Sequence, residues 1–146
     1  MTRSRRLARV VAVRVLEQRV CEARLAQAAA ELQRIEREIA EVESLCSRNL
    51  RESEAALACG EREMWTILRH CVRMLESRNE ALARKRREAA AGWHREQAAL
   101  QQSQQRRELA AVVKHRAFVA EQAEREKKEQ AAADEQYLSR RASATA

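Results

Sequence analysis

The sequence predicts an all-α protein: a long two-helix antiparallel coiled-coil hairpin, with its tip near Gly60 and an overhanging C-terminal helix. Three observations predict this fold. Charged residues make up 35% of the 146 residues and aromatic residues 3%, with two glycines and no proline, a composition typical of coiled coils and long helices. Apolar residues recur in heptads on both sides of Gly60. The apolar pattern then fades towards the C-terminus, and we expect a single domain over residues 1–146.

The first helix is expected from about residue 4 to residue 58. Its apolar residues recur every seven positions in two sets three positions apart, which is an a/d seam. The two sets are Leu25, Leu32, Ile39 and Cys46, and Ala28, Ile35 and Val42. Asn49, Ser53 and Ala56 continue the seam weakly. Opposite charges four residues apart, such as Arg34 and Glu38, suit the outer surface of a helix.

A turn is predicted at residues 59–61, where Cys59, Gly60 and Glu61 separate the two periodic stretches. Glycine readily adopts the left-handed conformation that ends a helix, and acidic residues suit the first turn of the next helix. Gly92 is flanked by good helix formers and is not expected to end a helix. The alternative is one continuous helix through Gly60 that dimerises along its length.

The second helix is expected from about residue 62 to residue 140. Its predicted stripe contains Met64, Ile67, Cys71, Met74 or Leu75, Leu82, Ala89, Trp93 and Leu100, and resumes from Leu109 to Val119. A tip near residue 60 pairs residues whose numbers sum to roughly 119. This register places Cys46 near Cys71, Arg3 near Arg116, and the start of the overhang at about residue 118.

Charge is distributed in blocks along the chain. Residues 1–19 contain six arginines and one glutamate, residues 20–59 contain five arginines and eight glutamates, and residues 78–107 contain eight lysines or arginines and three glutamates. Such blocks indicate acidic partners at particular places. The RKRR run at 84–87 is interpreted as a solvated basic face, because no aromatic stacking residues or recognition motif accompany it, although non-specific binding of polyanions stays open.

No active site is expected, because catalysis needs functional groups that converge in a concave site, which a two-helix hairpin does not offer. We therefore predict no catalytic residues, no cofactor, no metal site and no enzyme activity. His70, His94 and His115 are far apart. The four cysteines lack metal-ligand spacing and are interpreted as small buried hydrophobes in a reducing cytosol. No apolar run is long enough to cross a membrane, and a cytosolic protein is expected.

The start of the chain is apolar on more than one helical face. The residues concerned are Leu7, Val10, Val11, Val13, Val15 and Leu16. They either contact Leu109–Val113 in the seam or form a sticky, arginine-rimmed surface that a partner could enclose.

These features together resemble the FliJ/SctO (YscO, HrpO) family of type III export stalk proteins. The matching features are a mid-chain turn glycine followed by a tryptophan (GEREMW, Trp65), a second tryptophan about thirty residues later (GWHRE, Trp93), and a charged tail at 124–142. The resemblance covers the layout of the whole chain. It implies a cytoplasmic hairpin, peripheral at the inner-membrane export apparatus.

The resemblance also implies partners. The open end of such a hairpin enters a hexameric export ATPase, which here would involve Arg5, Arg6, Arg9, Val13, Arg140 and Arg141. Family members also contact the cytoplasmic domain of the export gate, and some handle secretion chaperones. The gate-binding register falls here on Cys71, Leu75, Arg78 and Leu82, of which only Leu75 fits the family pattern. A generic cytosolic coiled-coil adaptor and a basic rod that binds nucleic acid or membrane surfaces are the alternatives.

Overall fold

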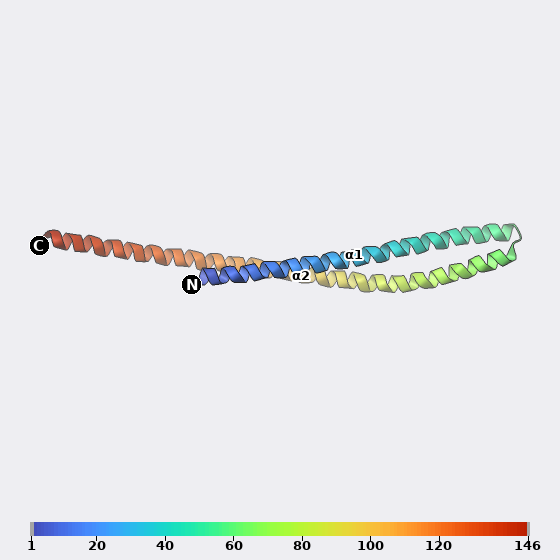
Figure 1. The fold of residues 1–146 in the computed structure, drawn as a ribbon, viewed down its shortest axis with the longest axis horizontal. Helices are drawn as coiled ribbons and strands as arrows, with labels where there is room; N and C mark the ends of the chain where they lie inside the picture. The colour runs from blue at the N-terminus through green and yellow to red at the C-terminus, as the bar shows by residue number, and fades with distance from the viewer. Residues whose placement is uncertain (1, 146) are drawn as a thin grey trace. The chain divides into compact units, whose positions relative to one another are not determined.

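Residues 2–145 are described by a computed structural model, and they form two long helices that pack against each other as an antiparallel hairpin (Figure 1). Helix α1 spans Arg3–Ala58 and helix α2 spans Arg62–Thr145, and no strand occurs between residues 2 and 145. The all-α hairpin predicted from the sequence is therefore confirmed. Its packing divides into two compact units. The turn unit is Cys21–Leu100, and the open-end unit combines the residues up to Val20 with those from Gln101 onward.

The turn at Gly60 ends α1 with a Schellman motif. Gly60 has a φ of 76°, in the left-handed region that glycine adopts without strain. The N–H of Glu61 donates to the Ala56 carbonyl oxygen at 2.9 Å, and the N–H of Gly60 donates to the Leu57 carbonyl oxygen at 3.1 Å. These two bonds satisfy carbonyl groups that the end of a helix leaves without partners. The predicted tip near Gly60 is confirmed, and the alternative of a continuous helix is excluded.

In the turn unit, the α1 face predicted to form the seam is the face that packs on α2. The seam positions, all buried or half-buried, are Cys21, Leu25, Ala28, Leu32, Ile35, Ile39, Val42, Cys46, Asn49, Ser53 and Ala56. Their spacing alternates between three and four residues, the a/d pattern of a coiled coil. Ser53 is fully buried, with its hydroxyl donating to the Leu50 carbonyl oxygen at 2.7 Å. The seam thus accepts a polar residue that bonds within its own helix.

Close to the turn, the α2 seam differs from the sequence prediction by one position. Further along, Leu82, Ala89, Trp93 and Leu100 are buried or half-buried as predicted. Met64 and Ile67, expected inside, are exposed, and of the two alternatives Met74 and Leu75 it is Leu75 that faces inward. The inward positions near the turn are Trp65, Leu68, Val72, Leu75, Asn79 and Leu82. The prediction was wrong here because two adjacent faces of α2 are apolar, so that periodicity alone could not choose between them.

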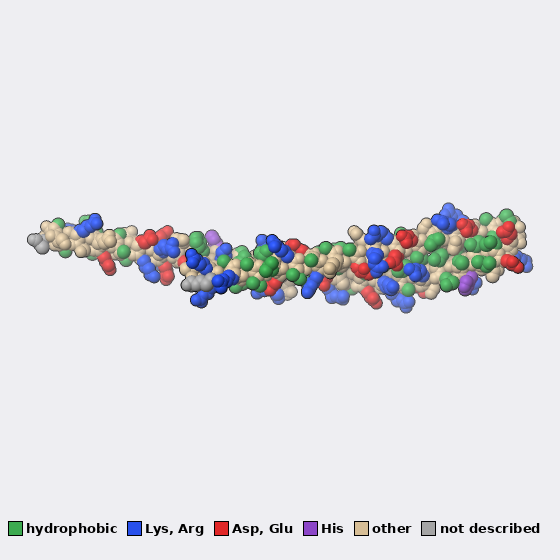
Figure 2. Space-filling model, viewed as in Figure 1, with side chains coloured by type: hydrophobic (Ala, Val, Ile, Leu, Met, Phe, Trp, Pro, Cys, Tyr) green, Lys and Arg blue, Asp and Glu red, His purple; other side chains and the backbone are tan. Residues whose placement is uncertain are grey.

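Opposite charge blocks face each other in the turn unit. Arg78 on α2 lies 3.8 Å from a Glu38 oxygen on α1, and Arg86 lies 3.6 Å from a Glu36 oxygen. Figure 2 shows Lys and Arg side chains intermixed with Asp and Glu side chains over part of this unit. The acidic block of the first helix therefore lies against the basic block of the second, which favours the antiparallel pairing. Each exposed pair contributes little by itself.

All four cysteines are free thiols. Cys21, Cys46 and Cys71 are half-buried at the edge of the seam, broadly as expected for small hydrophobes. Cys59 is exposed, which corrects the expectation that it is buried. It follows the last residue of α1, where the chain leaves the seam to enter the turn.

In the open-end unit, the first residues of α1 pack against α2 up to Gln122. Arg107 donates to Gln18 at 3.1 Å, and Ser4 contacts Glu121. From Ala123 to Thr145 every residue is exposed. The overhanging C-terminal helix is therefore confirmed, but it begins about five residues later than predicted, and α2 continues to Thr145 rather than about residue 140.

Candidate interaction surfaces

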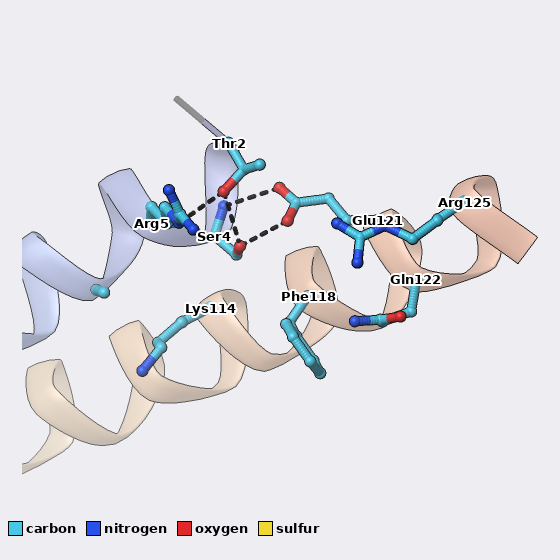
Figure 3. A pocket seen from close by; sticks show the side chains of 9 residues that line it. Thr2, Ser4, Arg5, Lys114, Phe118, Glu121, Gln122 and Arg125 are labelled. Carbon is cyan, nitrogen blue, oxygen red and sulfur yellow. Dashed lines mark hydrogen bonds between the residues drawn. The ribbon is translucent and has the colours of Figure 1, made fainter.

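The start of α1 is held by a carboxylate from α2, a feature called here the Glu121 clasp (Figure 3). The backbone N–H of Ser4 donates to Glu121 Oε1 at 2.9 Å, and the Ser4 hydroxyl donates to Oε2 at 2.5 Å. Thr2 adds a local cap, because its hydroxyl accepts the N–H of Arg5 at 3.4 Å. First-turn N–H groups have no partner within their helix and favour negative charge. The clasp therefore supplies from α2 an acceptor that α1 lacks.

The clasp lowers the pKa of the Glu121 carboxyl below its usual range. The Ser4 hydroxyl is the main cause, followed by the Ser4 N–H, and the Arg3 N–H and the Arg125 charge act in the same direction. Partial desolvation opposes them. Sequence reasoning placed Arg3 near Arg116 instead. Glu121 lies further along α2 because the first N–H groups of α1 point along the helix axis, past its start.

The residues predicted to meet the ATPase ring do not form one cluster. Arg5, Arg6, Arg9 and Val13 are exposed near the start of α1. Arg140 and Arg141 are also exposed, but they lie nineteen and twenty residues beyond Glu121 on α2. At about 1.5 Å per residue this separation is roughly 28 Å along the helix. The open-end unit thus presents two basic regions, one on each helix.

Apolar side chains accompany the arginines of the open-end unit. Val10, Val13, Leu16 and Val20 are exposed on α1, and Leu109, Val112, Phe118 and Val119 are exposed on α2. Val11 and Val15 are half-buried. The exposed residues form an apolar surface, as one interpretation expected, and Val11 and Val15 lie partly in the seam. The expectation that the α2 stripe resumes at Leu109, Val112 and Val119 is wrong, because these side chains are exposed. Contiguous exposed apolar residues are typical of interaction surfaces.

The four residues predicted to meet the export gate differ in accessibility. Leu82 is 3% exposed and packs in the seam, whereas Arg78 is exposed. Cys71 and Leu75 are half-buried, and Leu75 lines a shallow cavity together with Val42 and Cys46 of α1. These four side chains therefore do not share one exposed face.

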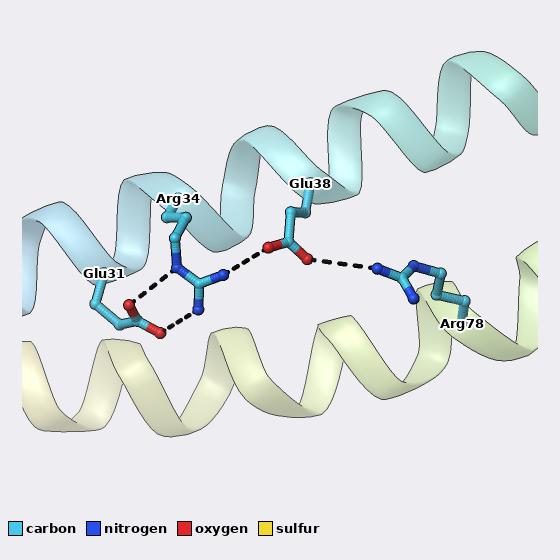
Figure 4. Close-up of polar contacts among 4 residues, drawn as sticks. All are labelled: Glu31, Arg34, Glu38 and Arg78. Atoms are coloured by element: carbon cyan, nitrogen blue, oxygen red, sulfur yellow. Dashed lines mark hydrogen bonds and ion pairs between the residues drawn. The ribbon is translucent and has the colours of Figure 1, made fainter.

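Arg78 also ends a chain of charged contacts that joins the two helices (Figure 4). Arg34 donates to Glu31 and, at 2.6 Å, to Glu38, whose other oxygen lies 3.8 Å from Arg78. The Arg34 hydrogen bond lowers the pKa of Glu31, and the same bond raises the pKa of Arg34. Arg78 is thus engaged on the protein surface by a carboxylate that is itself positioned by Arg34.

A second apolar face near the turn was missed as a surface by sequence reasoning. Met64, Ile67, Cys71 and Met74 follow three-, four- and three-residue spacing on α2, and all but Cys71 are exposed. These four residues are called the tip stripe. Figure 2 shows hydrophobic side chains gathered close to the turn. The signal was present in the sequence as heptad spacing, but it was assigned to the seam.

The remaining candidates show no convergent chemistry. His70, His94 and His115 are exposed, and His94 makes an edge contact with Trp93 at 5.0 Å between ring centroids. Within residues 2–145, no three His, Cys, Asp or Glu side chains are grouped so that they could hold a metal ion. In the basic run at 84–87, Arg86 approaches Glu36. Neither helix, over the described residues, has a segment apolar enough to cross a membrane.

Comparison with known proteins identifies the family. The family model described as "Flagellar FliJ protein" matches residues 3–145, which is nearly the whole chain. The chain belongs to the FliJ family. The FliJ family consists of components of flagellar and type III protein export, so the resemblance seen in the sequence is confirmed. No curated protein and no solved structure gives a significant match to the chain.

Proposed function

We propose that this FliJ-family protein is a non-enzymatic central stalk of a type III export apparatus, which inserts into the hexameric export ATPase and couples it to the export gate. The observation that carries the proposal is the exposed basic and apolar surface at the start of α1, formed by Arg5, Arg6, Arg9 and Val13. A ring lined by acidic side chains would attract this surface by charge complementarity. A partner surface with apolar patches would bury Val13.

The proposal is tested by reversing three charges in the variant R5E/R6E/R9E. We expect ATPase stimulation by the protein to be lost, because each substitution replaces attraction by repulsion. The matched control R84E/R87E/R95E makes the same charge change at exposed positions of α2 in the turn unit. Its stimulation should stay within about twofold of the unaltered protein, since exposed charges distant from an interface contribute little. Undiminished stimulation by R5E/R6E/R9E would contradict the proposal.

For the export gate we propose the tip stripe as the contact surface, with Arg78 and Leu75 at its edge. The spacing of Met64, Ile67, Cys71 and Met74 is that of a helix face that packs on another helix. Methionine side chains adapt well to such contacts. Leu82, buried against α1, is left out of the proposed surface. Contact with secretion chaperones is a further expectation that follows from the family.

The variant I67E/M74E tests the gate contact. Placing two carboxylates in the tip stripe should weaken binding to the isolated cytoplasmic gate domain by at least about tenfold, since each charge would be desolvated on binding. The control S77E/A91E adds the same charges at exposed positions outside the stripe. Calorimetric titration of both variants, with helicity checked by circular dichroism, distinguishes the outcomes. Equal affinity of the two variants would refute this assignment.

A further inference from the structure

A pocket beside the start of α1 is lined by more cationic side chains than carboxylates. It has a volume of about 360 Å³ and is lined from α1 by Arg5 and from α2 by Lys114, Phe118, Glu121 and Arg125, among others (Figure 3). All of it lies within the open-end unit. Its volume is within the range of pockets that bind ligands. It is called here the clasp pocket.

The charges of the clasp pocket do not balance. Three cationic side chains, Arg5, Lys114 and Arg125, meet one carboxylate, that of Glu121. Both oxygens of this carboxylate already accept hydrogen bonds from Ser4. Over residues 2–145, neither Arg5 nor Lys114 forms an ion pair. A surplus of about two positive charges therefore faces solvent at one place, where it would attract an anion.

An exposed aromatic residue lies among these cations. Phe118, the chain's single phenylalanine, is 49% exposed. Lys114, Phe118 and Gln122 follow one another at four-residue spacing, and Figure 3 shows their side chains along one side of α2. Aromatic and arginine side chains are enriched where proteins bind proteins, since they combine a large apolar area with directed polar contacts. The pocket therefore suits a ligand that carries both carboxylates and an apolar side chain.

We propose that the clasp pocket binds an acidic peptide segment of a partner protein. Carboxylates of the segment face Arg5, Lys114 and Arg125, and an apolar side chain of the segment packs on Phe118. The site lies at the same end as the proposed ATPase contact, and the inference rests on the proposed function only in taking the partner to be a protein. It adds to that contact a set of α2 residues.

A peptide fits the pocket better than a nucleic acid or a lipid surface. A nucleic acid needs a continuous basic track, whereas the exposed segment 124–128 on α2 mixes charges of both signs, with Glu124 and Glu126 among Arg125, Lys127 and Lys128. The Glu121 carboxylate inside the pocket would repel a phosphate or a carboxylate placed beside it. A short peptide can place its carboxylates on the cations and avoid Glu121.

The test uses the full chain and a fluorescein-labelled peptide of alternating glutamate and leucine residues, titrated by fluorescence anisotropy. The variant K114Q/R125Q should weaken binding about tenfold, as expected for the loss of two exposed charge contacts. Its matched control K127Q/K128Q removes two charges from the overhang and should change binding less than twofold. Similarly, F118A should weaken binding, whereas V119A, at the neighbouring exposed position outside the pocket, should not.

Several outcomes would overturn the inference. Equal losses in K114Q/R125Q and K127Q/K128Q would show that net charge alone attracts the peptide. Unchanged affinity of F118A for the peptide would contradict the proposed contact between Phe118 and an apolar side chain of the peptide. Tighter binding of a 20-base-pair DNA duplex or of anionic vesicles, with the same dependence on Lys114 and Arg125, would assign the pocket to polyanions. None of these results depends on the ATPase assay, and the variant R6E/R9E, whose two residues do not line the pocket, tests the proposed function separately.

Discussion

Substitution of Gly60 by alanine should lower the free energy of unfolding, because alanine adopts the backbone conformation at this position less readily than glycine does. Gly60 has a φ of 76°, and a Cβ added there would meet no atom within 4 Å. No side-chain clash therefore contributes, and the cost is that of placing an L-residue in the left-handed region, about 1–2 kcal/mol. A change of about 1 kcal/mol corresponds to roughly 4 °C in melting temperature for a chain of this size. Thermal and urea unfolding followed by circular dichroism at 222 nm would measure it.

Gly92 offers a matched control with the opposite sign. It lies within α2, and its added Cβ would approach only the Arg95 Nη2 atom, at an ordinary 3.7 Å. Gly92→Ala should therefore stabilise the protein by about 1 kcal/mol through helix propensity. A D-alanine introduced at position 60 by chemical ligation should be tolerated, because its preferred φ is positive. If Gly60→Ala were as stabilising as Gly92→Ala, the turn would not depend on the left-handed residue and the reasoning would be refuted.

Three further predictions concern the clasp and the seam. Because the folded pKa of Glu121 is depressed, the stability that the clasp gives to the start of α1 is present above the unfolded value near 4.5 and lost as pH falls through the folded pKa. Protection of the Ser4 amide from hydrogen exchange, corrected for the intrinsic exchange rate, should therefore decrease as pH falls through this range. In E121Q, which has no carboxylate to protonate, this pH dependence should be absent. Ser103→Ala should raise stability by about 1 kcal/mol, since the Ser103 hydroxyl is buried without a partner in the described structure; unchanged or lower stability in urea would contradict this. Leu82→Ala should cost about 2–5 kcal/mol, whereas Met74→Ala, at a side chain 62% exposed, should cost less than about 0.5 kcal/mol; similar costs would place Met74 back in the seam.

The first helix and the turn could be predicted from the sequence because each position carried a single signal. Leu32, Ile35 and Ile39 have charged neighbours on the other faces of their helix, so only one face could be buried. Gly60 was the one glycine situated between two periodic stretches. Local information sufficed for these elements, and the predicted hairpin follows from them.

The inward face at the start of α2 could not be decided in the same way. Met64 and Trp65, and likewise Ile67 and Leu68, are adjacent apolar pairs, so both registers satisfy a heptad pattern. The choice depends on how the turn aims α2 at α1, which is a tertiary effect. The Glu121 clasp was out of reach for a related reason. Glu121 accepts from both the backbone N–H and the hydroxyl of Ser4, and this pairing across 117 residues depends on where the start of α1 lies along α2, which no local pattern in the sequence marks.

The overhang has a thermodynamic consequence for any partner that binds it. From Ala123 to Thr145 no side chain is buried, so helix formation there gains nothing from a hydrophobic face. It rests on local terms such as the contact between Gln130 and Asp134 and on the three alanines at 131–133. Most helices in proteins are stabilised chiefly by packing of an amphipathic face, which this segment lacks. The affinity of a partner that binds at Arg140 and Arg141 should therefore depend on the free-energy cost of ordering the segment as a helix. Substitutions that change only the helix propensity of the segment should change this affinity even where the substituted side chain makes no contact with the partner.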